Sequence, residues 1–392
     1  MKTPQRRALG ALFFIYAFGL MSWVPRFPEV KANLGVSNGE FGTLISFTAI
    51  GSIISLLTVG QLVNRYGSRS IMTASATLLF GAIFLIVHLN TPWQFLLCNI
   101  ALGLGTSGLH TSINGQALHE QKPNGENLIS RLHGLWSLGA LTTSILAGLL
   151  AGKISLVAHI DILCALVYIS ILGLLRFLHP TLLLPNKNAA AAFKIRNIFQ
   201  SFNLDWRMAI GFTCAVALEF AVGDWAAIFS KEELHMSPSV SAIPYVLFML
   251  AMIMGRLTIH KLTSQFSLSY LIQRFVLVGG ATFMISVLLG VQISKSFMNL
   301  GFAIVVIGTF VGGLGASFLA PMIMDAANRR SKSSGAVVVG QLGAINALLI
   351  FFLKFVIAWT AQITSVGVAL LIPSAMLIGV AFLAKTIERA HH

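Results

Sequence analysis

The sequence is divided into apolar segments that are each about as long as a lipid bilayer is thick. The chain has 392 residues, of which 56% are hydrophobic and only 10% charged, whereas soluble domains carry roughly 25% charged residues. In lipid, an apolar segment of about 20 residues must be helical, because its backbone N–H and C=O groups find partners only within the segment. Twelve segments have this character, at residues 8–25, 40–62, 71–89, 93–118, 130–151, 155–177, 207–229, 239–259, 269–292, 297–324, 333–360 and 363–385. We therefore predict an all-α membrane protein with twelve transmembrane helices.

The positive charge of the chain is distributed unevenly around these segments. The formal net charge is +14, with 26 Lys and Arg. If the N-terminus is cytoplasmic, 20 of these basic residues flank the segments on the cytoplasmic side. The external loops then hold only Arg26, Lys31, Lys153, Lys231 and Lys295. Because Lys and Arg accumulate in cytoplasmic loops, the pattern predicts that both termini are cytoplasmic, and it explains the net charge without a nucleic-acid partner.

A basic polar stretch at 179–206 divides the twelve segments into six plus six. It predicts a helical bundle at 1–178, a cytoplasmic linker at 179–206 and a second bundle at 207–392. The halves repeat weakly, since "NLGVSNGEFG" after the first segment corresponds to "ELHMSPSVSA" after the seventh, and "SLGAL" in the fifth to "QLGAI" in the eleventh. Two parallel six-helix repeats that enclose a cavity at the membrane midplane form a transporter architecture.

The loop between the second and third segments carries the most specific motif. Residues 60–70 read "GQLVNRYGSRS" and resemble the major facilitator superfamily signature G-x-L-x-D-R-x-G-R-[RK]. The resemblance implies two pseudo-symmetric six-helix bundles, and it implies that this loop acts as a conformational latch. The latch residues would be Gly60, Asn64, Arg65, Gly67 and Arg69. Asn64 stands where the family usually has Asp, which weakens the expected charge relay, and the alternative is a plain turn whose arginines bind lipid phosphates.

Three further stretches are similar to one branch of that superfamily. "SWVPRFPEVKANLGVS", "RLHGLWSLGA" and "EFAVGDWAAIFS" resemble the fucose-permease-like and YbjJ-type proteins of the bacterial inner membrane. The resemblance implies a monomer in the inner membrane, in contact with lipids. It does not imply a substrate, because the fucose permease has carboxylates in its first and fourth helices, whereas the first segment here has none.

Two carboxylates interrupt the seventh apolar segment, in the stretch "ALEFAVGDW". An acidic side chain within a membrane costs a few kcal/mol unless it is paired or faces water. Glu219 lies near the midplane, and Asp224 lies about 7.5 Å closer to the outside. Both are predicted proton-coupling residues, and Glu219 should be the better proton carrier because it lies deeper. The two side chains point about 140° apart on a helix, so they should have different roles. We expect Asp224 to pair with Arg26 or Lys354, and a purely structural role for both acids is the alternative.

Polar and aromatic residues in other segments are candidates for solute binding. The family resemblance implies that segments 1, 2, 4, 5, 7, 8, 10 and 11 line the cavity. His110 and Asn114 lie four residues apart on one helix face. The predicted substrate-binding residues are Trp23, Arg26, His110, Asn114, His133, Trp136, Phe220, Gln341, Asn346 and Lys354. The alternative for each polar residue is a hydrogen bond between helices.

These features predict a secondary active transporter. The expected solute is small and polar, either sugar-like or an organic acid, and the expected coupling ion is the proton. An efflux antiporter for drugs or metabolites, or a transport-inactive sensor with the same fold, are the alternatives. The sequence has no HExxH or Walker motif, so neither a zinc-dependent enzyme nor an ATP-driven pump is expected. Cys98, Cys164 and Cys214 lack metal-ligand spacing, and we expect no metal or other cofactor.

Overall fold

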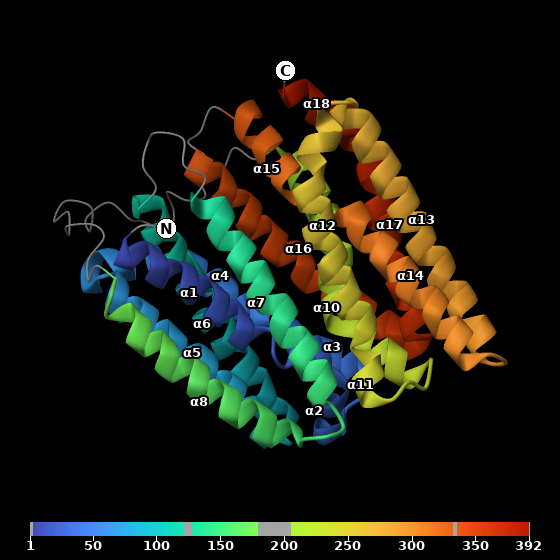
Figure 1. Ribbon diagram of the computed structural model, residues 1–392, viewed down its shortest axis with the longest axis horizontal. Coiled ribbons are helices and arrows are strands. Elements are labelled where there is room, and N and C mark those ends of the chain that lie inside the picture. Colours follow the sequence, from blue (N-terminus) through green and yellow to red (C-terminus); the bar gives the residue numbers. More distant parts are fainter. Residues whose placement is uncertain (1–2, 121–127, 179–204, 332–334, 392) are drawn as a thin grey trace. The chain divides into compact units, whose positions relative to one another are not determined.

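The computed structural model describes residues 3–120, 128–178, 205–331 and 335–391, and in these ranges the chain forms helices and no β-strand (Figure 1). The chain divides into two compact units. Unit 1 comprises Met1–Trp23, Leu44–Ala147 and Lys153–Phe202, and unit 2 comprises Val24–Thr43, Gly148–Gly152 and Asn203–His392. The linker predicted at 179–206 lies almost wholly outside the described residues, so the predicted domain division stays a prediction.

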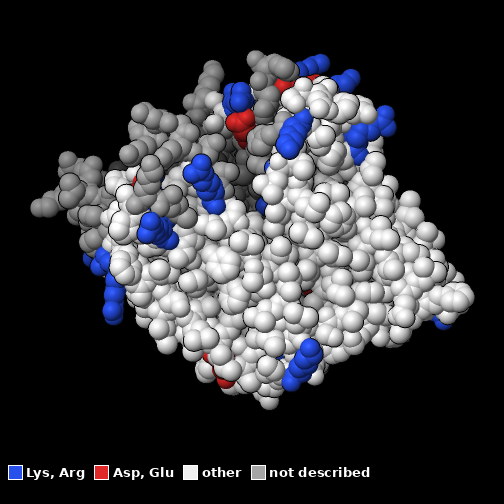
Figure 2. All heavy atoms as spheres, in the orientation of Figure 1, with Lys and Arg blue, Asp and Glu red and all other residues white. Residues whose placement is uncertain are grey.

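The helices have the length and composition of membrane spans. Eleven spans in the described part of the chain are long and apolar enough to cross a bilayer. A twelfth long helix, α6 (Pro92–Glu120), has 29 residues but includes polar side chains such as Asn99, His110 and Gln116. On the face drawn in Figure 2, the surfaces between the helix ends carry few charged side chains. The chain is therefore a multi-pass membrane protein.

Unit 1 contains the helices of the first half of the chain. They are α1 (Pro4–Leu20), α4 (Thr48–Tyr66), α5 (Ser68–His88), α6, α7 (Leu128–Leu150) and α8 (Leu156–Leu175). Helix α6 packs against α4 and α5. A Cβ at Gly51 would lie 1.9 Å from the Ile100 carbonyl oxygen, and one at Gly103 would lie 1.9 Å from the Thr48 carbonyl oxygen. Only glycine permits this approach of α4 to α6, as is usual for membrane helices that pack through small residues.

Unit 2 contains the helices of the second half together with a short segment from the first. They are η1 (Val24–Arg26), α2 (Phe27–Leu34), the start of α3 (Asn38–Ser46), α10 (Trp206–Glu232), α11 (Pro238–Ser241), α12 (Ile243–Thr263), α13 (Leu268–Ser294), α14 (Met298–Ala316), α15 (Leu319–Arg330), α16 (Gly335–Ile363), α17 (Val366–Gly379), η3 (Val380–Leu383) and α18 (Ala384–His391). Helices α13 and α14 lie side by side in Figure 1. Gly290 and Gly301 allow this contact, since a Cβ at Gly301 would lie 2.5 Å from the Gly290 carbonyl oxygen.

Several helix ends differ from the predicted segments for local reasons. The first helix ends at Leu20, short of the predicted residue 25, and η1 and α2 follow. Pro25 and Pro28 lack the backbone N–H that a continuous α-helix would need. A capping box precedes α3, because the Ser37 N–H and hydroxyl both donate to Glu40 Oε2 at 2.8 Å and the Glu40 N–H donates to Ser37 Oγ.

Candidate functional site

Helix α10 is joined to α16 by a short, largely buried ion pair. The Lys354 ammonium on α16 lies 2.8 Å from Asp224 Oδ2, and only 16% and 13% of the two side chains are exposed. The same ammonium lies 5.6 Å from the centre of the Phe220 ring, which is within the range of a cation–π interaction. The structure thus brings together three of the predicted residues. Of the two cations predicted as partners for Asp224, Lys354 is the one that contacts it.

Arg26 pairs with a different carboxylate from the one predicted. Its guanidinium Nη2 lies 2.5 Å from Glu29 Oε2, and its side chain is fully buried. Both residues lie at the junction of η1 and α2, three positions apart. The local spacing explains the pairing, because side chains three residues apart lie on the same face of a helical turn.

Glu219 forms a second, looser ion pair that the sequence does not reveal. Its carboxylate Oε2 lies 3.7 Å from Arg256 Nη2 on α12, with 33% and 39% of the side chains exposed. Arg256 Nε donates to the carbonyl oxygen of Ser317 at 2.9 Å. The two acids of α10 therefore meet different helices, as the predicted 140° separation implies. The available signal for Arg256 is its position fourteen residues into the 21-residue helix α12, whereas Lys261 lies near the end of that helix.

In unit 1, three predicted residues form a polar cluster. His133 Nε2 on α7 lies 3.1 Å from Asn114 Oδ1 on α6. The rings of His110 and His133 are 5.8 Å apart, edge to face. The ring of Tyr16 lies 6.1 Å from that of His110. The cluster combines hydrogen-bonding side chains from three helices, α1, α6 and α7, and of these Tyr16 is buried. Tyr16 was missed, because a tyrosine in an apolar helix is not by itself a signal.

The remaining predicted binding residues are mostly enclosed. Trp23 is 4% exposed and Gln341 is 7% exposed. The indole Nε1 of Trp136 and the amide Oδ1 of Asn346 are buried, and neither has a hydrogen-bond partner among the described residues. A buried polar atom without a partner is costly. The indole N–H of Trp136 can donate to a bound molecule or water, and the amide oxygen of Asn346 can accept from one.

The predicted loop at 60–70 is a single residue in the structure, because α4 continues to Tyr66 and α5 begins at Ser68. Gly67 has φ +84° and both ends α4 and begins α5. The Arg69 guanidinium donates to the carbonyl oxygens of Arg176 and Leu178 at the end of α8. Next to it, the side chain of Gln116 on α6 donates to Ser68 Oγ at 2.8 Å. The motif residues therefore contact α6 and α8, and Gln116 is a contact that the motif does not indicate.

Two other predicted latch residues are exposed. Asn64 and Arg65 both lie at the surface of unit 1, and the Arg65 guanidinium lies 5.2 Å from the Tyr66 ring centre. A Cβ at Gly60 would meet no atom within 4 Å. Packing within unit 1 therefore does not explain these three residues, and their role in a latch stays a prediction.

Residues of the 24–43 segment are bonded to α10 and α16 within unit 2. The Lys31 ammonium lies 2.6 Å from Glu232 Oε1, and the amide of Asn38 donates to Glu232 Oε2 at 3.2 Å. The indole of Trp359 donates to Thr43 Oγ1 at 3.1 Å. The sequence gives no signal for these contacts, since the partners are separated by about 200 to 300 positions.

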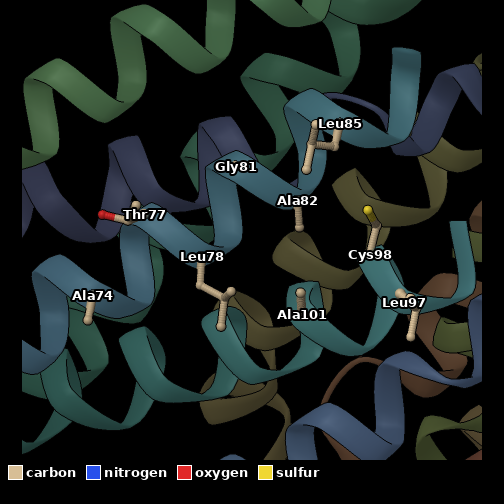
Figure 3. A pocket seen from close by; sticks show the side chains of 9 residues that line it. All are labelled: Ala74, Thr77, Leu78, Gly81, Ala82, Leu85, Leu97, Cys98 and Ala101. Atoms are coloured by element: carbon tan, nitrogen blue, oxygen red, sulfur yellow. The ribbon is translucent and has the colours of Figure 1, made fainter. Parts of the chain in front are cut away.

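A separate groove of about 620 Å³ lies between α5 and α6 (Figure 3). Its lining includes Leu78, Leu85 and Leu97, with Thr77 as a polar side chain at one side. A groove with such an apolar lining suits a lipid acyl chain better than a polar solute. We therefore take the polar cluster of unit 1 and the ion pairs of unit 2 as the candidate functional groups.

A family model, a relative in sequence and two solved structures all point to the same family of proteins. The model of the Major Facilitator Superfamily matches residues 9–348. An uncharacterized MFS-type transporter of Yersinia pestis is 27% identical over 384 residues, which cover 96% of this chain and 94% of that protein. Among solved structures, the D-xylose-proton symporter has a TM-score of 0.71 at 18% identity, covering 97% of this chain and 96% of its own. The nucleoside transporter NupG has a TM-score of 0.72 at 14% identity and covers 99% of both chains.

Proposed function

Because the chain belongs to the Major Facilitator Superfamily, we propose that it is a proton-coupled transporter of a small polar solute. The family and the multi-pass helical fold establish a membrane transporter. The solute class and the coupling to protons are our proposal. The solute is sugar-like or an organic acid, and it moves across the bacterial inner membrane by alternating access.

The observation that supports proton coupling is the weak pairing of Glu219. This carboxylate lies at the middle of a 27-residue apolar helix, where an ionised acid is costly unless it is well compensated. Its single ion-pair partner among the described residues is 3.7 Å away, too far for a hydrogen bond. Taking up a proton removes the cost of the charge. A group in this position can therefore carry a proton when the transporter changes state.

The neighbouring Asp224 supports this assignment by contrast. Its ion pair with Lys354 is closed at 2.8 Å and is largely buried. Separating these two charges would leave an uncompensated charge in an apolar environment. We therefore assign Asp224 and Lys354 to holding α10 against α16, and Glu219 to the proton.

The polar cluster of unit 1 supports a polar solute. His110, Asn114 and His133 present hydrogen-bonding groups beside aromatic rings, a combination that suits hydroxylated compounds. One structurally similar protein is a D-xylose-proton symporter and another is a nucleoside transporter. Pentoses and nucleosides are therefore reasonable first compounds to test beside organic acids.

The arrangement in the membrane is part of the same proposal. Lys and Arg are in excess in both tails and in the loops that lie on the same side of the membrane as the tails, which supports cytoplasmic termini. We propose a monomer, as the family resemblance implies.

The test is uptake into proteoliposomes that contain the purified protein. Pentoses, nucleosides and organic acids are offered with and without an inward proton gradient. We expect one class to accumulate only when the gradient is present, and a protonophore to abolish the accumulation. Equal accumulation of that solute without a proton gradient would contradict proton coupling.

A further inference from the structure

The guanidinium of Arg256 is fixed in place on one side only. Its Nε donates to the Ser317 carbonyl oxygen at 2.9 Å, which holds the side chain against the end of α14. Its Nη2 faces Glu219 Oε2 at 3.7 Å. A guanidinium carries five N–H donors, so both terminal nitrogens retain donors for another acceptor.

The two ion pairs of α10 differ in how accessible they are. Arg256 and Glu219 are 39% and 33% exposed, whereas Lys354 and Asp224 are 16% and 13% exposed. The nitrogen–oxygen distance is 3.7 Å in the Arg256–Glu219 pair and 2.8 Å in the Lys354–Asp224 pair, a difference of 0.9 Å. The Arg256–Glu219 pair therefore has open surface beside it that a ligand could occupy, while the Lys354–Asp224 pair is largely buried.

The chemistry of an anchored arginine selects the ligand. Guanidinium binds carboxylate and phosphate groups through paired N–H donors, and such charge-assisted hydrogen bonds are about twice as strong as neutral ones. Glu219 is itself a carboxylate, held too far away to form these bonds. A free carboxylate that reaches Arg256 at hydrogen-bond distance would be bound more tightly than Glu219 is.

We propose that Arg256 binds the anionic group of a monovalent organic acid, and that this acid displaces Glu219 from the guanidinium. This inference rests on the proposed function and names its solute class. The ionised pair of Arg256 and Glu219 has no net charge, and binding a monovalent anion gives the site a net charge of minus one. A proton on Glu219 returns the net charge to zero. One proton is then taken up for each monovalent anion, without a change in net charge at the site.

Other charges around α10 do not replace this pairing. Several helices that pack against α10 carry charged side chains other than Arg256. Among the described residues these are Glu29, Lys31, Lys261, Asp325, Arg329, Arg330 and Lys354, together with Arg26 on η1. Most of these have carboxylate or basic partners of their own, including Arg26 with Glu29, Lys31 with Glu232 and Arg329 with Asp325. Glu219 has Arg256 as its ion-pair partner in the described part of the chain.

The test compares acids with neutral analogues of the same shape. The purified full-length protein is titrated with glycerate and glycerol, D-gluconate and D-glucitol, and shikimate and its methyl ester, and thermal unfolding is followed. A ligand that binds the folded state raises its apparent stability in proportion to ln(1 + [L]/Kd). We expect at least one acid to stabilise the protein and its neutral partner not to do so.

Variants then locate the binding site. R256Q should weaken binding of the stabilising acid by about ten- to a hundred-fold, the loss of a charge-assisted pair. E219Q should bind it as tightly as the wild type or more tightly, because the internal competitor is uncharged. The matched control R329Q removes an arginine whose partner is Asp325 on the exposed end of α15, and it should bind normally. If R256Q does not fold, R256K keeps the charge without the paired donors and should bind the acid less tightly.

Several results would overturn the anion site. They are stabilisation by the neutral compounds alone, no stabilisation by any of the acids, or equal stabilisation of wild type, R256Q and R256K by the same acid. Gradient-driven accumulation of a neutral sugar would refute the anion site and leave the proposed proton coupling intact. Binding of an acid that depends on Arg256, without gradient-driven accumulation, would support the anion site and refute proton coupling.

Discussion

Removing one charge of the Lys354–Asp224 pair should destabilise unit 2 more than removing both. The two groups are 2.8 Å apart and largely buried. K354Q leaves the Asp224 carboxylate without its cation, and D224N leaves the Lys354 ammonium without its anion. In either single variant a charge remains in an apolar environment, whereas the double variant contains only neutral groups that can still form a hydrogen bond.

The magnitude follows from the cost of an unpaired buried charge. Breaking a buried ion pair from one side typically costs about 3–5 kcal/mol, while replacing both partners is often close to neutral. K354Q also removes the ammonium that lies 5.6 Å from the Phe220 ring centre, an interaction worth about 0.5–2 kcal/mol. We therefore expect K354Q to be destabilised at least as much as D224N, and the double variant less than either.

The assay is thermal unfolding of the four purified proteins in detergent, complemented by the yield of monodisperse protein. The control is the pair Arg329–Asp325, which is 2.9 Å apart but 51% and 43% exposed. Breaking it should change stability by about 1 kcal/mol or less, because exposed pairs are screened by solvent. If the losses of K354Q and D224N simply add in the double variant, the two charges do not interact and the reasoning fails.

Three other changes test separate parts of the structure. G67A places a side chain at φ +84°, which should cost about 1–3 kcal/mol and slow transport while solute affinity stays within a few-fold. Burial raises the pKa of Glu233 from its ordinary value of 4.5, and the backbone N–H groups of Gly367 and Val366 partly offset the rise. A raised folded-state pKa gives stability that is complete below the unfolded pKa and is lost as pH rises through the folded pKa. E233Q should therefore flatten the fall in thermal stability with rising pH, and an unchanged pH profile would contradict this assignment. A cysteine at Lys231 should react with an impermeant maleimide in intact cells and one at Ser331 only after permeabilisation, and the reverse pattern would refute the predicted topology.

Much of the architecture could be predicted because the bilayer restricts the chain to helices of a known length. Apolar segments located the helices, and the family signature at 60–70 indicated their arrangement. The breaks were less predictable. The end of the first helix at Leu20 depends on how Pro25 and Pro28 are accommodated, and the apolar composition continues beyond it.

The candidate site could be predicted only in part. Its depth in the seventh apolar segment singles out Glu219, and Lys354 is one of the two expected partners for Asp224. The Glu219–Arg256 contact depends on how α10 packs against α12, which the sequence spacing does not determine. His110 and Asn114 share a face through their spacing of four residues, but the contact of Asn114 with His133 also requires α6 to lie beside α7.

The most direct test of Glu219 as the proton carrier separates proton coupling from solute movement in the E219Q variant. Proteoliposomes that contain wild type or E219Q are assayed with the solute that the wild type accumulates, once for exchange at equal pH and once for accumulation under an inward proton gradient. We predict that E219Q keeps the exchange and loses the accumulation, since Gln imitates the protonated acid but cannot release a proton. Accumulation by E219Q at the wild-type level would contradict the assignment of Glu219 as the proton carrier.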